Sequence, residues 1–145
     1  PGEPAAHAQL TVNTPLSEDT GYCVQAAEVE VDPETGEVEI KRMVAAQDVG
    51  TIINEIGHQA QIEGAVHMGL GYALTEDFPT DESGRPTAMT LRQLGILRAK
   101  DVPVIDVVLV ESPQPGAPYG IKGVGEIGLV PTAGAVAAAL HDEAA

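Results

Sequence analysis

The chain has 145 residues, with 22 acidic and 7 basic side chains and a formal net charge of −15 at pH 7. A charge of this size repels phosphate backbones and anionic membrane surfaces, which argues against nucleic-acid or membrane binding as the main function. The single cysteine excludes an internal disulfide and an all-cysteine zinc or iron–sulfur site within the chain. The hydrophobic fraction of 43% is nearly all aliphatic and suffices for the core of one ordinary domain.

Targeting signals are not apparent in the sequence. No apolar run approaches the roughly 20 residues that span a bilayer, and residues 1–10 lack the basic and apolar regions of a signal peptide. We therefore expect a soluble protein in a reducing compartment, the cytoplasm. The chain begins without an initiator methionine, and we expect it to be part of a longer protein.

The first elements form a predicted hairpin. Residues 1–20 contain several prolines and little periodicity, which predicts an extended lead-in to a domain over residues 21–145. Apolar and acidic residues alternate cleanly over residues 27–31, as in a half-buried strand. The turn sequence DPETG follows at residues 32–36, and apolar alternation then resumes. Residues 21–48 should therefore form an antiparallel hairpin.

A helix is predicted over residues 54–75, where apolar residues recur at helical spacing. This segment carries Gly64, Gly69 and Gly71. A glycine inside a helix costs about 0.5 to 1 kcal/mol relative to alanine. We therefore expect another backbone or a ligand to approach this helix closely at the glycines.

Three further segments follow along the chain. Residues 79–88 are predicted to be a polar loop, residues 105–111 an apolar strand, and residues 131–141 a helix that opens on a proline. The fold class we expect is α+β, with an antiparallel β-hairpin and mixed strands packed against two main helices.

The glycine-rich stretch YGIKGVGEIG occupies residues 119–128, just before the last helix. Glycines let successive backbone N–H groups point into one concavity, so the natural guest is anionic. The stretch contains a literal GxGxxG at residues 123–128, which suggests a dinucleotide-binding module. That fingerprint joins a strand directly to a helix, whereas here the helix begins only at Pro131. We therefore treat dinucleotide binding as the weaker alternative.

Four separated segments carry a further pattern: EVEVDPETGEVEI, DVGTIIN at residues 48–54, QIEGAVHMGLGYALTED at residues 61–77, and YGIKGVGEIGLVPTAGAVAAAL at residues 119–140. In this order they resemble the hairpin, the helix with its lead-in, and the catalytic loop with the last helix of the molybdenum hydroxylases, the xanthine dehydrogenase and aldehyde oxidase family. The resemblance runs from about Pro15 to the end. It implies a fragment of the molybdopterin-binding domain, from the C-terminal part of the molybdopterin-binding subunit.

The sequence departs from the family pattern at three positions. Glu55 stands where the family often has proline, and Ala60 and Ala65 stand where it usually has glycine. These departures leave Gln61 and Glu126 in place, so the residues that matter most to the resemblance are intact.

The resemblance implies roles for five residues. Glu126 matches the catalytic base of a hydroxylation that adds water-derived oxygen to a purine or a related heteroaromatic or aldehyde carbon. Gln61 matches a glutamine that hydrogen-bonds the molybdopterin cofactor, and Gly123 and Gly125 would bring their N–H groups close to it. Lys122 would orient the loop or balance charge near the anionic cofactor, with an ordinary surface lysine as the alternative. The metal itself needs no protein ligand.

The resemblance also implies what lies outside this chain. The parent enzyme would carry iron–sulfur clusters and FAD elsewhere, and the partners would be the remainder of the molybdopterin subunit, electron-transfer domains or subunits, and a small-molecule substrate of purine metabolism. We expect the isolated chain to be inactive and to expose an apolar surface through which a homo-oligomer could form. A non-catalytic scaffold or interaction domain of the same fold is the competing hypothesis, and intact Glu126 and Gln61 argue against it.

Overall fold

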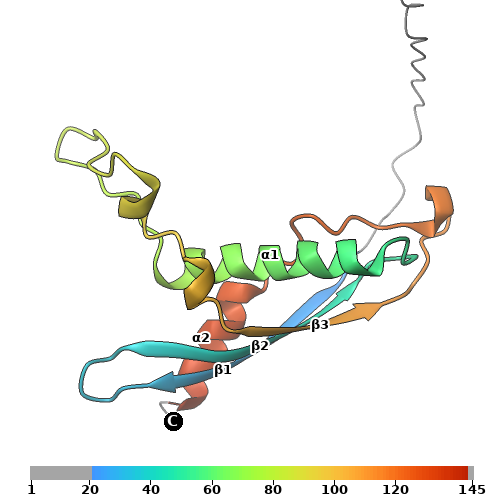
Figure 1. Ribbon diagram of the computed structural model, residues 1–145, viewed down its shortest axis with the longest axis horizontal. Coiled ribbons are helices and arrows are strands. Elements are labelled where there is room, and N and C mark those ends of the chain that lie inside the picture. The colour runs from blue at the N-terminus through green and yellow to red at the C-terminus, as the bar shows by residue number, and fades with distance from the viewer. Residues whose placement is uncertain (1–20, 144–145) are drawn as a thin grey trace, which may run out of the picture.

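The computed structural model describes residues 21–143, so the predicted lead-in over residues 1–20 lies outside the described part. Three strands form one mixed sheet in the order β1-β2-β3 (Figure 1). β1 (Cys23–Val31) pairs antiparallel with β2 (Val38–Asp48), which confirms the hairpin. β3 (Val104–Val110) runs parallel to β2, so the sheet is mixed, as expected.

Two α-helices complete the fold and confirm the predicted ones. α1 (Glu55–Leu74) forms the crossover that two parallel strands require, and α2 (Thr132–Glu143) closes the described chain. No helix within residues 21–143 combines the length and the apolar character needed to cross a membrane. Three short 3-10 helices that the sequence did not predict lie in the connections: η1 (Leu91–Leu94), η2 (Ala99–Asp101) and η3 (Pro118–Gly120).

Local hydrogen bonds explain where the hairpin turns and where α1 begins. Asp32 Oδ1 accepts a hydrogen bond from the Glu34 amide at 2.8 Å, and Gly36 takes a φ of 73° that closes the turn. Asn54 Oδ1 accepts a hydrogen bond from the Gly57 amide at 2.9 Å and so caps the helix. Both features follow from residue types that the sequence presents at these positions.

The core lies between one face of the sheet and the two helices. It is aliphatic, as the composition predicts, and its fully buried members come from β2, the segment after it, α1 and α2: Met43, Ala45, Val49, Ile62, Val66, Leu70 and Val136. Burial of such side chains, at roughly 25 cal/mol per Å² of apolar surface, is the main force that holds the helices on the sheet.

Within residues 21–143, no helix or strand covers the opposite face of the sheet. Its valines include Val24, which is 70% exposed, and Val104, which is 64% exposed, and Val108 and Val110 are also exposed. We call this surface, made of Val24, Val104, Val108 and Val110, the open sheet face. Exposed apolar surface of this kind is unusual on a free domain. The expected exposed apolar surface is therefore present in the structure.

The three glycines of α1 differ in their surroundings. A Cβ at Gly69 would lie 2.5 Å from Cβ of Thr132, so α2 can pack against α1 only because position 69 has no side chain. A Cβ at Gly71 would collide with the Glu76 carboxylate. Nothing lies within 4 Å of a Cβ at Gly64. Gly69 therefore has a close neighbour, which is the Thr132 side chain rather than backbone, and at Gly64 the approach of a ligand stays a prediction.

This difference gives a matched pair of substitutions in one helix. Gly69→Ala should lower the free energy of unfolding by about 1–3 kcal/mol, because the added methyl group overpacks the α1–α2 contact. Gly64→Ala should raise it by about 0.5–1 kcal/mol, because alanine costs less conformational entropy in a helix and meets no neighbour. Urea unfolding of both variants measures the two effects, and equal effects would contradict the described helix contact.

Candidate functional site

A buried ion pair anchors the glycine-rich stretch, residues 119–128, which we call the glycine loop. Lys122 Nζ lies 2.5 Å from Oδ2 of Asp48, the last residue of β2, and the two side chains are only 10% and 9% exposed. Asp48 Oδ1 also accepts a hydrogen bond from the Gly50 amide at 3.0 Å. The buried carboxylate is therefore bonded through both oxygens.

Backbone hydrogen bonds continue this anchor along the segment that follows β2. The Lys122 amide donates to the Val49 carbonyl at 3.2 Å, and the Thr51 amide donates to the Gly120 carbonyl at 3.0 Å. Gly50 makes this approach possible, because its φ of 67° suits glycine and a Cβ there would lie 2.5 Å from the Gly120 oxygen. The beginning of the glycine loop is thus held to the end of β2.

The protonation of Asp48 is set by two opposing effects. Burial pushes the pKa of Asp48 up, but the hydrogen bonds from Lys122 and the Gly50 amide outweigh it and hold the pKa below its usual value. A lowered native pKa stabilises the fold above the ordinary carboxyl pKa of about 3.9, and this stabilisation is lost as the pH falls through the native value. The anchor is therefore intact at neutral pH and weakens in acid.

The far end of the glycine loop is held at Gly128. Its carbonyl accepts a hydrogen bond from Gln25 Nε2 at 2.5 Å. A Cβ at Gly128 would lie 3.0 Å from Cβ of Ala65 and 3.1 Å from Oε1 of Gln47, so a side chain would push the loop away from β2 and α1. Gln47 is fully buried, and neither atom of its amide has a hydrogen-bond partner among the described residues.

Between these two ends the glycine loop is open. A Cβ at Gly123 or at Gly125 would meet nothing within 4 Å. Within residues 21–143, the N–H groups from Gly123 to Gly128 donate to no protein acceptor. Successive unpaired amides on glycine-rich backbone form a concavity suited to an anion. The donors present therefore fit an anionic group.

The glycine loop meets α1 at Gly128, close in sequence to Glu126 on the loop and to Gln61 on the helix. Glu126 is two residues before Gly128, and a Cβ at Gly128 would lie 3.9 Å from Cα of Ile62, the neighbour of Gln61. Figure 1 shows the chain running from η3 along α1 toward α2. Both side chains are exposed, and neither makes a hydrogen bond or ion pair with another described residue. The backbone contact at Gly128 thus links the two segments that carry the predicted residues, and both polar groups are accessible.

Lys122 lies in a different environment from the other predicted residues. The alternative of a surface lysine is wrong, because the side chain is buried and its ammonium group bonds Asp48. That contact fixes the orientation of the loop, and a contact of Lys122 with a cofactor stays a prediction.

Sequence reasoning missed three residues that support the loop: Asp48, Gln25 and Gln47. Gln25 and Gln47 occupy inward-facing positions of β1 and β2 whose neighbours on the same face are apolar. Burying a polar side chain among apolar ones costs free energy unless it makes a hydrogen bond. Two glutamines at apolar positions of the strands were therefore the sequence signal for a contact there. Asp48 belongs to the quoted DVGTIIN segment, but its partner is distant in the sequence.

The GxGxxG stretch at residues 123–128 does not join a strand to a helix. β3 ends at Val110, η3 intervenes, and α2 begins only at Thr132. The described chain thus lacks the strand–turn–helix context of a dinucleotide site. Among residues 21–143, no group of three or more His, Cys, Asp and Glu side chains is arranged to hold a metal ion.

The class of protein that this geometry suits is a domain that binds an anionic group at a loop beside a helix. The chain belongs to the family of molybdopterin cofactor-binding domains, whose model matches residues 5–103. The resemblance to the molybdenum hydroxylases drawn from the four sequence segments is thereby confirmed. The glycine loop lies beyond the residues that the family model matches.

Individual relatives cover most of the chain. It is 34% identical over 122 residues to the gamma subunit of the 6-hydroxypseudooxynicotine dehydrogenase complex of Paenarthrobacter nicotinovorans, a match that covers 83% of this chain and 15% of that protein. It is 38% identical over 117 residues to a probable xanthine dehydrogenase subunit of Bacillus subtilis (strain 168), a match that covers 81% of this chain and 16% of that protein. The crystal structure of quinoline 2-oxidoreductase from Pseudomonas putida 86 matches with a TM-score of 0.76 and 36% identity, covering 81% and 15%. The chain thus spans 15–16% of the length of these relatives.

The ion pair can be tested by a double-mutant cycle. Lys122→Met should lower the free energy of unfolding by about 3 kcal/mol, because it leaves the Asp48 charge buried without its cation. Adding Asp48→Leu should recover most of this loss, because an apolar pair of similar size has no charge to desolvate on folding. Urea unfolding at neutral pH measures the cycle.

The exposed pair of Arg98 with Asp101 provides the control, and Arg98→Met should change stability little because water screens that pair. An Lys122→Met variant as stable as the parent would contradict the anchoring role. The loss caused by Lys122→Met should also shrink as the pH falls toward the native pKa of Asp48, because protonation removes the buried charge.

Proposed function

We propose that this chain is the C-terminal, catalytic-base portion of a molybdopterin-dependent hydroxylase, most like xanthine dehydrogenase. The observation that carries the proposal is that the Glu126 carboxylate is accessible on a loop held in place. Its carboxylate is exposed and makes no hydrogen bond or ion pair with another described residue, yet it sits on a loop held at both ends by the Lys122–Asp48 pair and by Gly128. An available carboxylate on a fixed loop is what general-base catalysis requires.

The residues that would hold the cofactor surround Glu126. The N–H groups of Gly123 and Gly125 would donate to the anionic cofactor, and the amide of Gln61 offers a donor and an acceptor from α1. Lys122 would add a positive charge beneath the loop while its contact with Asp48 keeps the loop in place. When bound, the cofactor supplies the molybdenum centre that takes up the electrons of the oxidation.

Within this arrangement Glu126 accepts a proton at its carboxylate from the oxygen nucleophile that attacks the substrate carbon. Assistance of this kind is typically worth roughly 10²–10⁴-fold in rate. The substrate we propose is a purine or a related heteroaromatic compound, with aldehydes as the wider class. Support comes from relatives whose names refer to xanthine, quinoline and 6-hydroxypseudooxynicotine, all of which contain a nitrogen heteroaromatic ring.

The partners follow from the small share of the relatives that the chain covers. We propose that the remainder of the molybdopterin subunit, with iron–sulfur and FAD domains or subunits, completes a cytoplasmic enzyme of purine metabolism. One relative is named as part of a complex, which supports partner subunits. The 145 residues alone are then expected to be inactive, because most of the cofactor and substrate contacts would come from elsewhere.

We also propose that the open sheet face drives self-association of the isolated chain. Valines exposed on β1 and β3 lose unfavourable contact with water when a second surface covers them. Sedimentation velocity at rising protein concentration should show a growing dimer fraction. Replacing Val24 and Val108 with threonine should reduce that fraction, whereas a purely monomeric parent chain at high concentration would contradict the hypothesis.

The catalytic role is tested in the full-length enzyme with Glu126→Gln. The substitution keeps the size and removes the proton acceptor, so kcat for purine hydroxylation should fall by at least about 10²-fold. Molybdenum content, measured by mass spectrometry, should stay near that of the parent, because the loop amides are unchanged.

Glu82→Gln, in the polar loop of residues 79–88, is the matched control and should keep full activity. Undiminished turnover in Glu126→Gln with normal molybdenum content would remove the mechanism and favour the scaffold hypothesis. Loss of molybdenum in Glu126→Gln would instead assign this residue to cofactor binding.

A further inference from the structure

β2 has an edge that β3 leaves uncovered. The pairing of β2 with β3 begins at Arg42 opposite Val104, whereas β1 pairs with β2 as far as Val38. Residues 38–41 therefore have a strand on one side only within the described chain. On the other side, the N–H and C=O groups of alternate residues lack a strand partner. This four-residue stretch is a ready place for a further strand in line with β3.

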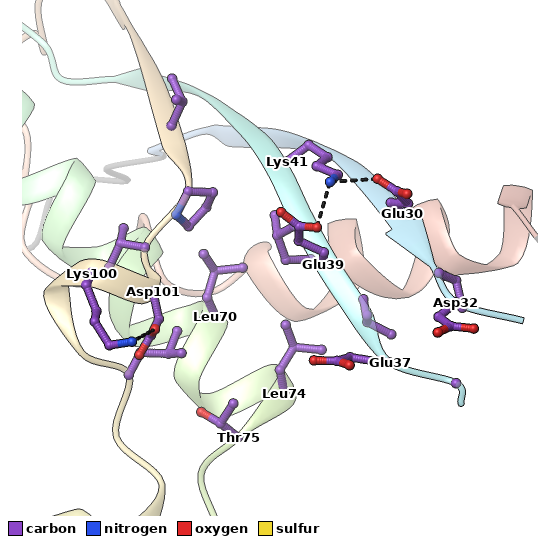
Figure 2. Close-up of a pocket in the computed structure, with 18 of the residues that line it drawn as sticks. Glu30, Asp32, Glu37, Glu39, Lys41, Leu70, Leu74, Thr75, Lys100 and Asp101 are labelled. Carbon is purple, nitrogen blue, oxygen red and sulfur yellow. Dashed lines mark hydrogen bonds and ion pairs between the residues drawn. The ribbon is translucent and has the colours of Figure 1, made fainter. Parts of the chain in front are cut away.

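A groove lies directly beside this open edge, and Figure 2 shows it between the hairpin and the segment around η2. Its volume is about 1250 Å³. Leu70 and Leu74 of α1 contribute to an apolar floor, and Val38 and Ile40 point from β2 toward the same side. We call this hollow the edge groove. An extended backbone placed along β2 would have apolar surface on its inner side.

The outer rim of the edge groove is acidic. Acidic side chains outnumber basic ones among its lining residues. Lys41 lies 2.6 Å from both Glu30 and Glu39, so one cation serves two carboxylates (Figure 2). Glu37 also lines the groove and makes no ion pair with another residue of the described range 21–143. The chain as a whole carries a charge of −15. A basic segment would therefore be favoured in this groove.

We propose that the edge groove binds an extended segment of a separate polypeptide in which apolar and basic side chains alternate. The segment adds as a strand beside residues 38–41 and donates and accepts main-chain hydrogen bonds there. Because side chains of a strand alternate between its two faces, the apolar ones meet the leucine floor and the basic ones meet Glu30 and Glu39. Main-chain pairing supplies affinity, and the alternation supplies specificity.

Two other occupants fit these observations less well. A second copy of this chain would bring its own acidic hairpin against Glu30 and Glu39, and like charges at a strand pairing repel. Charged side chains on an edge can also serve only to prevent pairing. A purely protective edge, however, needs no apolar floor, whereas Leu74 is partly exposed within the groove.

The test uses a synthetic peptide of about eight residues, in which valine and arginine alternate, added to the intact chain. Fluorescence anisotropy should show saturable binding, and hydrogen exchange should slow at the amides of residues 38–41. Two control peptides should fail to bind: one in which glutamate replaces arginine, and one in which a central proline prevents strand pairing. Binding of the proline peptide with equal affinity would overturn the proposal.

Two charge reversals distinguish binding of the peptide in the edge groove from its general attraction to an acidic protein. Glu39→Lys should weaken binding of the arginine peptide by about fivefold or more, because it removes a contact at the rim. Glu82→Lys makes the same change of net charge in the polar loop, outside the groove, and should have a much smaller effect. Equal weakening by both variants, or exchange protection elsewhere with residues 38–41 unchanged, would overturn the proposal. Neither variant touches Glu126, so the result is independent of the proposed catalytic role.

Discussion

The buried ion pair between Asp48 and Lys122 is the contact on which the arrangement of the site depends. It joins the last residue of β2 to the beginning of the glycine loop and is reinforced by backbone bonds on both sides. A buried ion pair adds little stability in itself, because desolvation of both charges offsets much of their attraction. What it supplies is a fixed position, since removal of either partner would leave a buried charge uncompensated.

The glycines around the loop serve two different purposes. At Gly50 and Gly128 a side chain would collide with the neighbouring backbone or side chains, so glycine permits close packing at the two ends. At Gly123 and Gly125 there is open space, so glycine leaves the backbone amides accessible. The loop is consequently closely packed where it meets the sheet, and its backbone is accessible where a cofactor would approach. This division favours positional accuracy for Glu126 without burial of its carboxylate.

The open sheet face and the edge groove differ in the kind of binding partner that they suit. The open sheet face presents exposed valines, which suit non-directional apolar burial. The edge groove combines unpaired backbone, apolar floor and acidic rim, which suits an oriented and selective contact. The edge groove lies beside residues 38–41, at the opposite end of β2 from Asp48 and the start of the glycine loop, so a segment bound there leaves Glu126 accessible.

The sequence by itself determined the local elements and the family. Alternation and the DPETG turn predict the hairpin, helical spacing after residue 54 predicts α1, and four ordered segments identify the cofactor-binding family. Only the tertiary structure decided the partner of Lys122, the parallel placement of β3 on β2, the bond from Gln25 to Gly128, and the burial of Gln47. The reason is physical: periodicity and turn propensity act over a few residues, whereas Asp48 and Lys122 are 74 residues apart and meet only when the sheet and the crossover helix have packed.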